Sequence, residues 1–296
     1  MNAIIMAAGA SSRFVPLSYE KPKGLLNVKG EILIERQIRQ LQEANIFDIT
    51  IVVGYKAELF EYLIAKYGVS IVLNEDYKIY NNTSSLIRVI DKLEDTYICS
   101  SDNYFTHNVF IGSPTHSYYS ALYSNHCINE YFITYDNDSN ITKVDIEPNC
   151  GWYMIGHVFF NREFSNYFRS TLLNEYSNIE TKMGYWEDVY IRHIDQLPKM
   201  KIHRYEVNDI KEFDSLEELR NFDSTYINHS GCKTLEYICK ELNCEEENIN
   251  NIISLKDNGS FSSFYFTNTL NGCRYIYRHL ANDHEKLVLD SVTNKK

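Results

Sequence analysis

MNAIIMAAGASSRFVPLSYEKPKGLL, residues 1–26, is the stretch that most restricts how this chain can fold. Its apolar run Asn2–Ala7 predicts a short buried strand. A glycine directly after a buried strand lets the backbone approach a ligand closely, and successive backbone N–H groups in such a loop can hold phosphates. Arg13 and Lys23 add a bidentate clamp and a point charge. The stretch therefore predicts a strand followed by a loop for a polyanionic ligand, although the same residues also suit an ordinary solvated loop.

The next part of the chain alternates strand and helix signals. β-Branched or apolar runs predict strands at Asp48–Val53, Val69–Leu73 and Thr96–Ser100. Helical spacing of apolar residues predicts helices at Ile32–Ala44, Ala57–Tyr67 and Ser84–Leu93. This alternation predicts parallel βαβ units, and so an α/β fold with a Rossmann-like, mixed but mainly parallel sheet flanked by helices. Ligands of such sheets bind beyond the carboxyl ends of the strands.

The pattern changes twice further along. Alternating residues over 116–160 predict a small antiparallel subdomain. Helices are expected at Asn161–Tyr176, Glu187–Asp195 and Ser215–Phe222, and a strand at Lys201–Val207. After about residue 230 the pattern restarts, with a helix at Leu235–Leu242 and strands at Ser260–Thr267 and Arg274–Arg278 around an Asn271-Gly272 turn. We therefore expect a domain at 1–229 and a small α+β module at 230–296.

Composition excludes several classes of protein. The 296 residues are 44% hydrophobic with a net charge of −11, which argues against nucleic-acid and anionic-membrane partners. The seven cysteines form no C-x-x-C pair, which favours reduced thiols in the cytoplasm. The apolar start lacks a basic segment before it, so we expect neither a signal peptide nor a membrane span.

The N-terminal stretch closely resembles the signature AAGxGxRxxPLTxxxPKxL of sugar-phosphate and choline-phosphate nucleotidyltransferases. Ser11 stands where many members have glycine, which keeps the position small. The resemblance implies that Ala8 and Gly9 touch the base or ribose and that Arg13 and Lys23 are the catalytic contacts to the phosphates.

Two aspartates are candidates for a Mg²⁺ site. Asp102 comes just after a predicted strand, where a carboxylate suits Mg²⁺ or simply caps a turn. The family places its metal aspartate at the end of this strand. The segment around Asp214 resembles the family's late D(S/T) segment, and Asp214 could also cap the next helix.

Five segments resemble bacterial CTP:phosphocholine cytidylyltransferases more closely than sugar-nucleotide enzymes, and the resemblance covers residues 1–225. These segments are Ile51–Tyr55, Tyr80–Asn82 followed by Ser85–Leu86, Ser101–Tyr104, Asn129–Phe132 and Tyr185–Asp188. The implied nucleotide-binding residues are Ala8, Gly9, Ala10, Asn82, Ser84 and Ser101.

Aromatic faces with a balancing carboxylate bind quaternary ammonium groups. The candidate acceptor-binding residues are Tyr131, Tyr185, Trp186, Glu187 and Asp188. Each aromatic could instead belong to the core. The family often has tryptophan where Tyr131 stands, and tyrosine can also bond a primary ammonium, so phosphoethanolamine and 2-aminoethylphosphonate stay open beside phosphocholine.

The hypothesis that follows is a Mg²⁺-dependent cytidylyltransferase in which the acceptor phosphate attacks the α-phosphorus of CTP in line, without a protein nucleophile. A sugar-1-phosphate nucleotidyltransferase is the rival enzyme. A nucleotide-binding regulator without turnover is the rival of another class.

Residues Ile249–Arg278 weakly resemble the opening strands of choline kinase-like proteins. The sequence holds no H-x-D-x-x-x-x-N catalytic loop, so it does not encode a complete kinase. We expect either part of a fusion to a kinase domain or a remnant used for packing or self-association, as in a homodimer.

Overall fold

The fold is described from a computed structural model, which covers residues 1–257, 260–280 and 284–289. The chain forms two compact units. The first contains Met1–Ala10 and Gly24–Glu212, and the second contains Ser11–Lys23 and Phe213–Lys296. Residues 230–296, predicted as a separate module, thus fall in the second unit together with part of the N-terminal loop.

The first unit is built on a mixed sheet, nine-stranded over its fully described residues. Its parallel strands are β1 (Asn2–Ala7), β4 (Ile49–Val53), β5 (Ser70–Leu73) and β6 (Thr96–Ser100), in the order β6-β1-β4-β5. The sheet continues from β6 through antiparallel β11 (Asn149–Phe160) to β9 (Phe132–Tyr135) and β10 (Ile141–Asp145). The long strand β8 (Tyr118–Ile128) pairs with β11 and with β12 (Lys201–Arg204). This arrangement confirms the predicted fold class.

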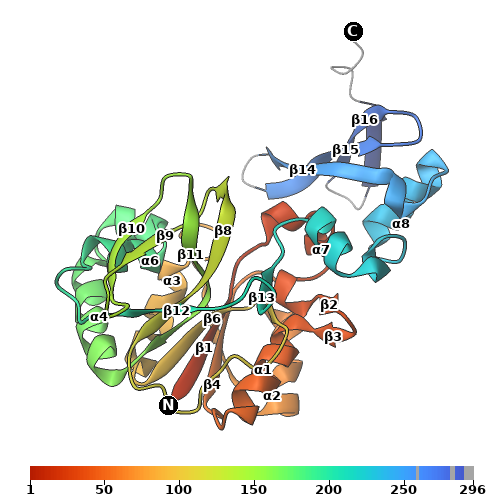
Figure 1. The fold of residues 1–296 in the computed structure, drawn as a ribbon. Coiled ribbons are helices and arrows are strands. Elements are labelled where there is room, and N and C mark those ends of the chain that lie inside the picture. The colour runs from red at the N-terminus through yellow and green to blue at the C-terminus, as the bar shows by residue number, and fades with distance from the viewer. Residues whose placement is uncertain (258–259, 281–283, 290–296) are drawn as a thin grey trace. The chain divides into compact units, whose positions relative to one another are not determined.

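Alternation along the central strand fills two cores. In β1, Ala3 and Ile5 point into one core and Ile4 into the other, because successive strand side chains point to opposite faces. Helix α1 (Leu33–Glu43) and α2 (Tyr62–Tyr67) cover the first face. Helices α3 (Thr83–Leu86), α4 (Arg162–Glu175) and α6 (Trp186–Arg192) cover the second (Figure 1), and α5 spans Ile179–Met183.

Two predicted helices are shorter than expected. The segment 57–67 begins as a 3-10 helix, η4 (Ala57–Phe60), before α2. The segment 84–93 continues from α3 as η5 (Ile87–Lys92), where Val89 has a non-helical φ of −127°. None of the described helices is long and apolar enough to cross a bilayer.

The second unit combines short helices with an antiparallel sheet. Its helices are α7 (Leu216–Phe222) and α8 (Lys233–Leu242), and the loop 11–23 carries the 3-10 helices η1 (Ser12–Phe14) and η2 (Leu17–Tyr19). The sheet runs β14 (Ile249–Asp257), β15 (Ser260–Asn268), β16 (Cys273–Leu280), β17 (His284–Leu289), each strand antiparallel to the next. The predicted hairpin joins β15 to β16, with Gly272 at a φ of +67°. Sequence patterns missed β14 and β17.

A buried histidine lies inside the first unit among aromatic rings. His157 is 1% exposed, and its ring packs at 5.4–6.0 Å from those of Phe105, Tyr97 and Tyr118. Burial lowers the pKa of His157 to about 3 from its ordinary 6.5, with a further contribution from His203. The folded protein therefore holds this imidazole neutral.

Protonation of His157 on unfolding should make the protein less stable in acid. Between pH 6.5 and pH 3 the unfolded chain binds a proton here that the folded chain does not, so the free energy of unfolding falls as the pH falls. Urea denaturation should show the parent protein losing about 2 kcal/mol more than His157→Gln between pH 7 and pH 5. Equal losses in both proteins would show that His157 is not the acid-sensitive group.

Candidate active site

Three neighbouring parallel strands of the first unit end at one edge of the sheet. Ala8 follows β1, Gly54 follows β4, and Ser101 follows β6. The backbone N–H of Tyr55 donates to the Ala8 carbonyl at 3.0 Å, and that of Ser101 to the Met6 carbonyl at 3.2 Å. The carboxyl-terminal edge of such a sheet is the usual place for a nucleotide.

Glycines permit close packing at this edge. A Cβ on Gly54 would lie 2.8 Å from the Ala8 carbonyl oxygen and 2.7 Å from the Tyr77 ring. A Cβ on Gly24 would lie 3.0 Å from the Ser101 side chain. In contrast, no atom of the described residues lies within 4 Å of a Cβ built on Gly9. The fold therefore needs glycine at position 54 but not at position 9, which is exposed.

Helix α1 fixes the backbone on both sides of Asp102. The Gln37 amide donates to the carbonyls of Ser100 at 2.7 Å and Asn103 at 3.0 Å. Arg36 donates to the carbonyls of Phe105 at 2.7 Å and Thr106 at 3.0 Å, downstream of the aspartate. Asp102 is thus held at a fixed point of the chain just beyond β6.

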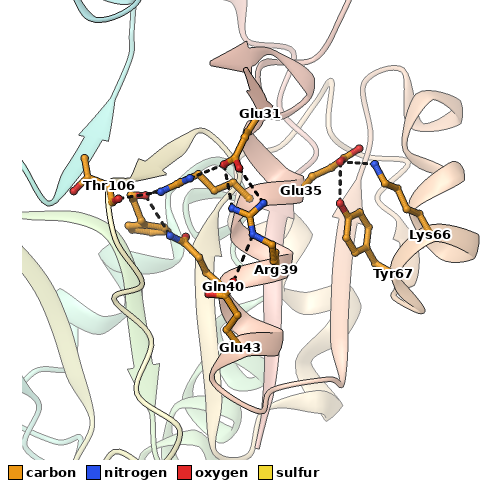
Figure 2. Close-up of polar contacts among 10 residues, drawn as sticks. Glu31, Glu35, Arg39, Gln40, Glu43, Lys66, Tyr67 and Thr106 are labelled. Carbon is orange, nitrogen blue, oxygen red and sulfur yellow. Dashed lines mark hydrogen bonds and ion pairs between the residues drawn. The ribbon is translucent and has the colours of Figure 1, made fainter. Parts of the chain in front are cut away.

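An ion-pair network orients the helix that holds this segment (Figure 2). Glu31 accepts from Arg39 and from Arg36, and this contact lowers the pKa of the Glu31 carboxyl. On the adjoining part of α1, Glu35 accepts from Lys66 at 2.6 Å and from the Tyr67 hydroxyl at 2.8 Å. The network ties α1 both to the segment after β6 and to α2.

In the second unit, the predicted catalytic cations meet a predicted metal ligand. Arg13 Nη1 lies 2.9 Å from Asp214 Oδ2, and Lys23 Nζ lies 3.5 Å from Asp214 Oδ1. The Arg13 side chain is 74% exposed, whereas that of Lys23 is only 8% exposed and lies 5.6 Å from the Phe14 ring centre. A carboxylate thus bridges a buried cation and an exposed one. Ser215, rather than Asp214, accepts the N-cap hydrogen bond of α7.

The predicted acceptor residues gather at the start of α6. The Tyr131 hydroxyl donates to Asp188 Oδ1 at 3.0 Å, and the Tyr185 N–H donates to Asp188 Oδ2 at 2.7 Å. The rings of Tyr131 and Tyr185 meet edge to face at 6.4 Å, and Tyr185 is 46% exposed. These three residues form an accessible aromatic and acidic group.

Glu187 lies deeper in the same cluster. It accepts from the Tyr119 hydroxyl at 3.1 Å and from the Asn82 amide at 3.3 Å. Burial raises the pKa of the Glu187 carboxyl to about 7, although both of these hydrogen bonds oppose the rise. Sequence reasoning missed Tyr119, because an aromatic in an apolar strand gives no signal of a polar partner.

Three other residues predicted to bind substrates make contacts within the protein instead: Trp186, Asn82 and Ser84. Trp186 is 3% exposed and packs in the core against the rings of Tyr119, Phe160 and Phe168. The Asn82 side-chain oxygen accepts from the backbone N–H of Trp186 at 2.9 Å. Ser84 is fully buried, where its hydroxyl donates to the Asn81 carbonyl and accepts from Asn74.

Comparison with known proteins agrees with this geometry. Residues 3–110 match the MobA-like NTP transferase domain, and together with the sheet and its loop this defines a nucleotidyltransferase. The choline-phosphate cytidylyltransferase of Streptococcus pneumoniae is 34% identical over 230 residues, 78% of this chain and 100% of the relative. The chain belongs to the family of bacterial choline-phosphate cytidylyltransferases.

Two further likenesses refine the comparison. The 2-aminoethylphosphonate cytidylyltransferase of Lancefieldella rimae is 33% identical over 231 residues, 76% of this chain and 93% of the relative. The solved structure of the CTP:phosphocholine cytidylyltransferase of S. pneumoniae superposes with a TM-score of 0.73 at 35% identity, covering 75% of this chain and 97% of that one.

Alanine substitutions at Gly54 and Gly9 distinguish a glycine that the fold requires from one that only a ligand would require. Gly54→Ala forces the Ala8 carbonyl and Tyr77 apart and should lower the free energy of unfolding by about 1–3 kcal/mol. Gly9→Ala should leave it unchanged or raise it by less than about 1 kcal/mol. Chemical denaturation measures both, and a Gly9→Ala protein as unstable as Gly54→Ala would contradict this assignment.

Proposed function

We propose that this chain transfers CMP from CTP to phosphocholine, giving CDP-choline and pyrophosphate. The observation that carries the choice of acceptor is the group formed by Tyr131, Tyr185 and Asp188, with Glu187 behind it. Aromatic rings next to carboxylates suit a cation that is large and poorly hydrated. Family membership supports the nucleotide and the reaction class.

The hydrogen bonds of the two carboxylates favour a quaternary ammonium. Asp188 already accepts from the Tyr131 hydroxyl and the Tyr185 N–H, and Glu187 already accepts from Tyr119 and Asn82. A trimethylammonium group needs charge balance and ring contact but donates no hydrogen bond. It can therefore bind without displacing these donors.

A primary ammonium is the second candidate, and it would make 2-aminoethylphosphonate or phosphoethanolamine the acceptor. The Tyr131 hydroxyl supports it, because this group can accept a hydrogen bond from an ammonium while donating to Asp188. The L. rimae relative, named for 2-aminoethylphosphonate, supports it as well.

In the proposed complex, residues Ala8–Ala10 and Ser101 receive the nucleoside, while Arg13 and Lys23 bind the triphosphate. The exposed Gly9, which the fold does not need, supports close approach of the nucleotide there. Asn82 and Ser84 stay predicted neighbours of the cytosine. Because they hydrogen-bond Trp186 and Asn74, we propose that they shape the cytosine site without contacting the base directly. Trp186 would support the acceptor site from the core.

Asp102 and Asp214 are proposed to hold Mg²⁺, and their chemistry fits this ion. Both offer hard carboxylate oxygens, and Asp214 is 38% exposed. Among the described residues there is no cluster of three or more His, Cys, Asp or Glu side chains that could hold a metal alone. Mg²⁺ accepts such a sparse protein set because substrate phosphates and water complete its coordination. When bound, it would neutralise charge on the phosphates.

The chain's own residues then contribute positioning and fixed charge. An oxygen of the acceptor phosphate forms a bond to the α-phosphorus of CTP, and the bond from that phosphorus to the bridging oxygen of pyrophosphate breaks. Arg13 and Lys23 stabilise the charge that develops on the departing pyrophosphate. The acceptor phosphate is already anionic, so no general base is needed.

An acceptor screen tests this function. Pyrophosphate release should be fastest with CTP and phosphocholine, and at least about tenfold slower with UTP, GTP or ATP, or with glucose 1-phosphate as acceptor. Faster turnover with 2-aminoethylphosphonate or phosphoethanolamine would establish the second candidate. Binding of CTP with no pyrophosphate release for any acceptor would instead indicate a regulator.

Glu187 should make acceptor binding depend on pH. Its pKa is raised to about 7, so the anion that attracts an ammonium forms as the pH rises through 7. The KM for phosphocholine should therefore fall between pH 6.5 and pH 8, and Glu187→Gln should raise it about tenfold at pH 8, a loss of about 1.4 kcal/mol.

The KM for CTP serves as the internal control and should change little, because a glutamine at position 187 can still accept from Asn82. Titration of the acceptor phosphate affects both proteins alike, so the difference between their pH profiles isolates Glu187. Parallel profiles for the parent protein and Glu187→Gln would remove this residue from the acceptor site.

A further inference from the structure

The loop that carries Arg13 and Lys23 packs with the C-terminal module in one compact unit. Its middle part is buried, with Phe14 and Val15 each 1% exposed and Leu17 4% exposed. The Arg13 side chain, at 74%, stays exposed. The loop thus has a buried anchor and an accessible charged tip.

The first contact between loop and module is aromatic. The Tyr19 ring lies 6.1 Å from that of Phe264 in β15 and 6.4 Å from that of Tyr277 in β16, nearly parallel to the latter. Phe264 and Tyr277 are fully buried and stack on each other at 5.0 Å. The ring of Tyr19 therefore joins the aromatic core of the C-terminal sheet.

The second contact is polar and comes from the adjacent residue. Glu20 Oε1 accepts from the backbone N–H of Lys233 at 2.7 Å. Lys233 is the first residue of α8, whose N-cap Cys232 makes no side-chain cap hydrogen bond. The Glu20 carboxylate thus satisfies a donor at the positive end of this helix from far away in the sequence.

We infer that Tyr19 and Glu20 are positioning residues through which the C-terminal module sets the geometry of the triphosphate-binding loop. The inference rests on the proposed function. A match to 78% of this chain covers 100% of the S. pneumoniae relative, so this chain is longer than that enzyme by about the size of the module. The efficiency with which this chain uses CTP therefore depends on α8 and on the β15–β16 hairpin.

Lys233→Pro removes the backbone donor to Glu20 and leaves in place the Cys232 side chain, which also hydrogen-bonds Glu20. Proline fits the first position of a helix, where its φ is suitable. The preceding Cys232 is extended, at φ −88° and ψ 114°, as a residue before proline should be. The matched control is Lys233→Ala, which keeps the N–H and alters only an exposed side chain.

Lys233→Pro should lower kcat/KM for CTP about tenfold, corresponding to about 1.4 kcal/mol, while the KM for the acceptor changes less than twofold. Lys233→Ala should match the parent protein. Tyr19→Leu should lower kcat/KM for CTP more than Tyr19→Phe, which keeps the ring. Unchanged kinetics in a folded Lys233→Pro protein with a lower melting temperature would overturn the inference, because the contact would then be merely structural.

Amide hydrogen exchange over residues 12–20 gives a readout independent of turnover. Exchange there should be at least about tenfold faster in Lys233→Pro than in Lys233→Ala, because the loop loses the hydrogen bond from the Lys233 N–H to Glu20. Equal exchange overturns the inference even if the parent protein proves inactive. Inactivity of the parent with every nucleotide and acceptor, in contrast, overturns the proposed function.

Discussion

A buried lysine next to a carboxylate is the constraint around which this loop is organised. Lys23 is almost completely shielded from water, and a buried cation is stable only near negative charge. Asp214 supplies this negative charge through one carboxylate oxygen, and its other oxygen pairs with the exposed Arg13. Because an exposed ion pair is weak, the Arg13 side of this contact can be exchanged for a phosphate at little cost. The same arrangement therefore stabilises the loop and, under the proposed function, leaves Arg13 available to a phosphate.

Much of the first unit could be predicted from sequence because local signals and tertiary structure agree. The apolar runs at Asn2–Ala7, Asp48–Val53 and Thr96–Ser100 all became strands of the parallel core, and Asp102 follows the third. What stayed hidden depends on contacts between distant residues. The burial of Trp186 follows from Phe160 and Phe168, and periodicity cannot distinguish a core aromatic from one that faces a ligand.

The second unit was harder to predict for the same reason. Its strand β14 alternates polar and apolar residues irregularly, with register shifts against β15 that break the period of two. The partners of Tyr19 lie in β15 and β16, at the far end of the chain. In the sequence Glu20 is only an acid among cations, and its function as a helix cap emerges from the fold.

A crystal structure with CTP and Mg²⁺ tests the central claim most directly. The account predicts triphosphate oxygens within hydrogen-bonding distance of Arg13 and Lys23, with the ion bound by Asp102 and Asp214. A triphosphate bound elsewhere, with the Arg13–Asp214 pair intact and Asp102 away from the ion, would contradict it.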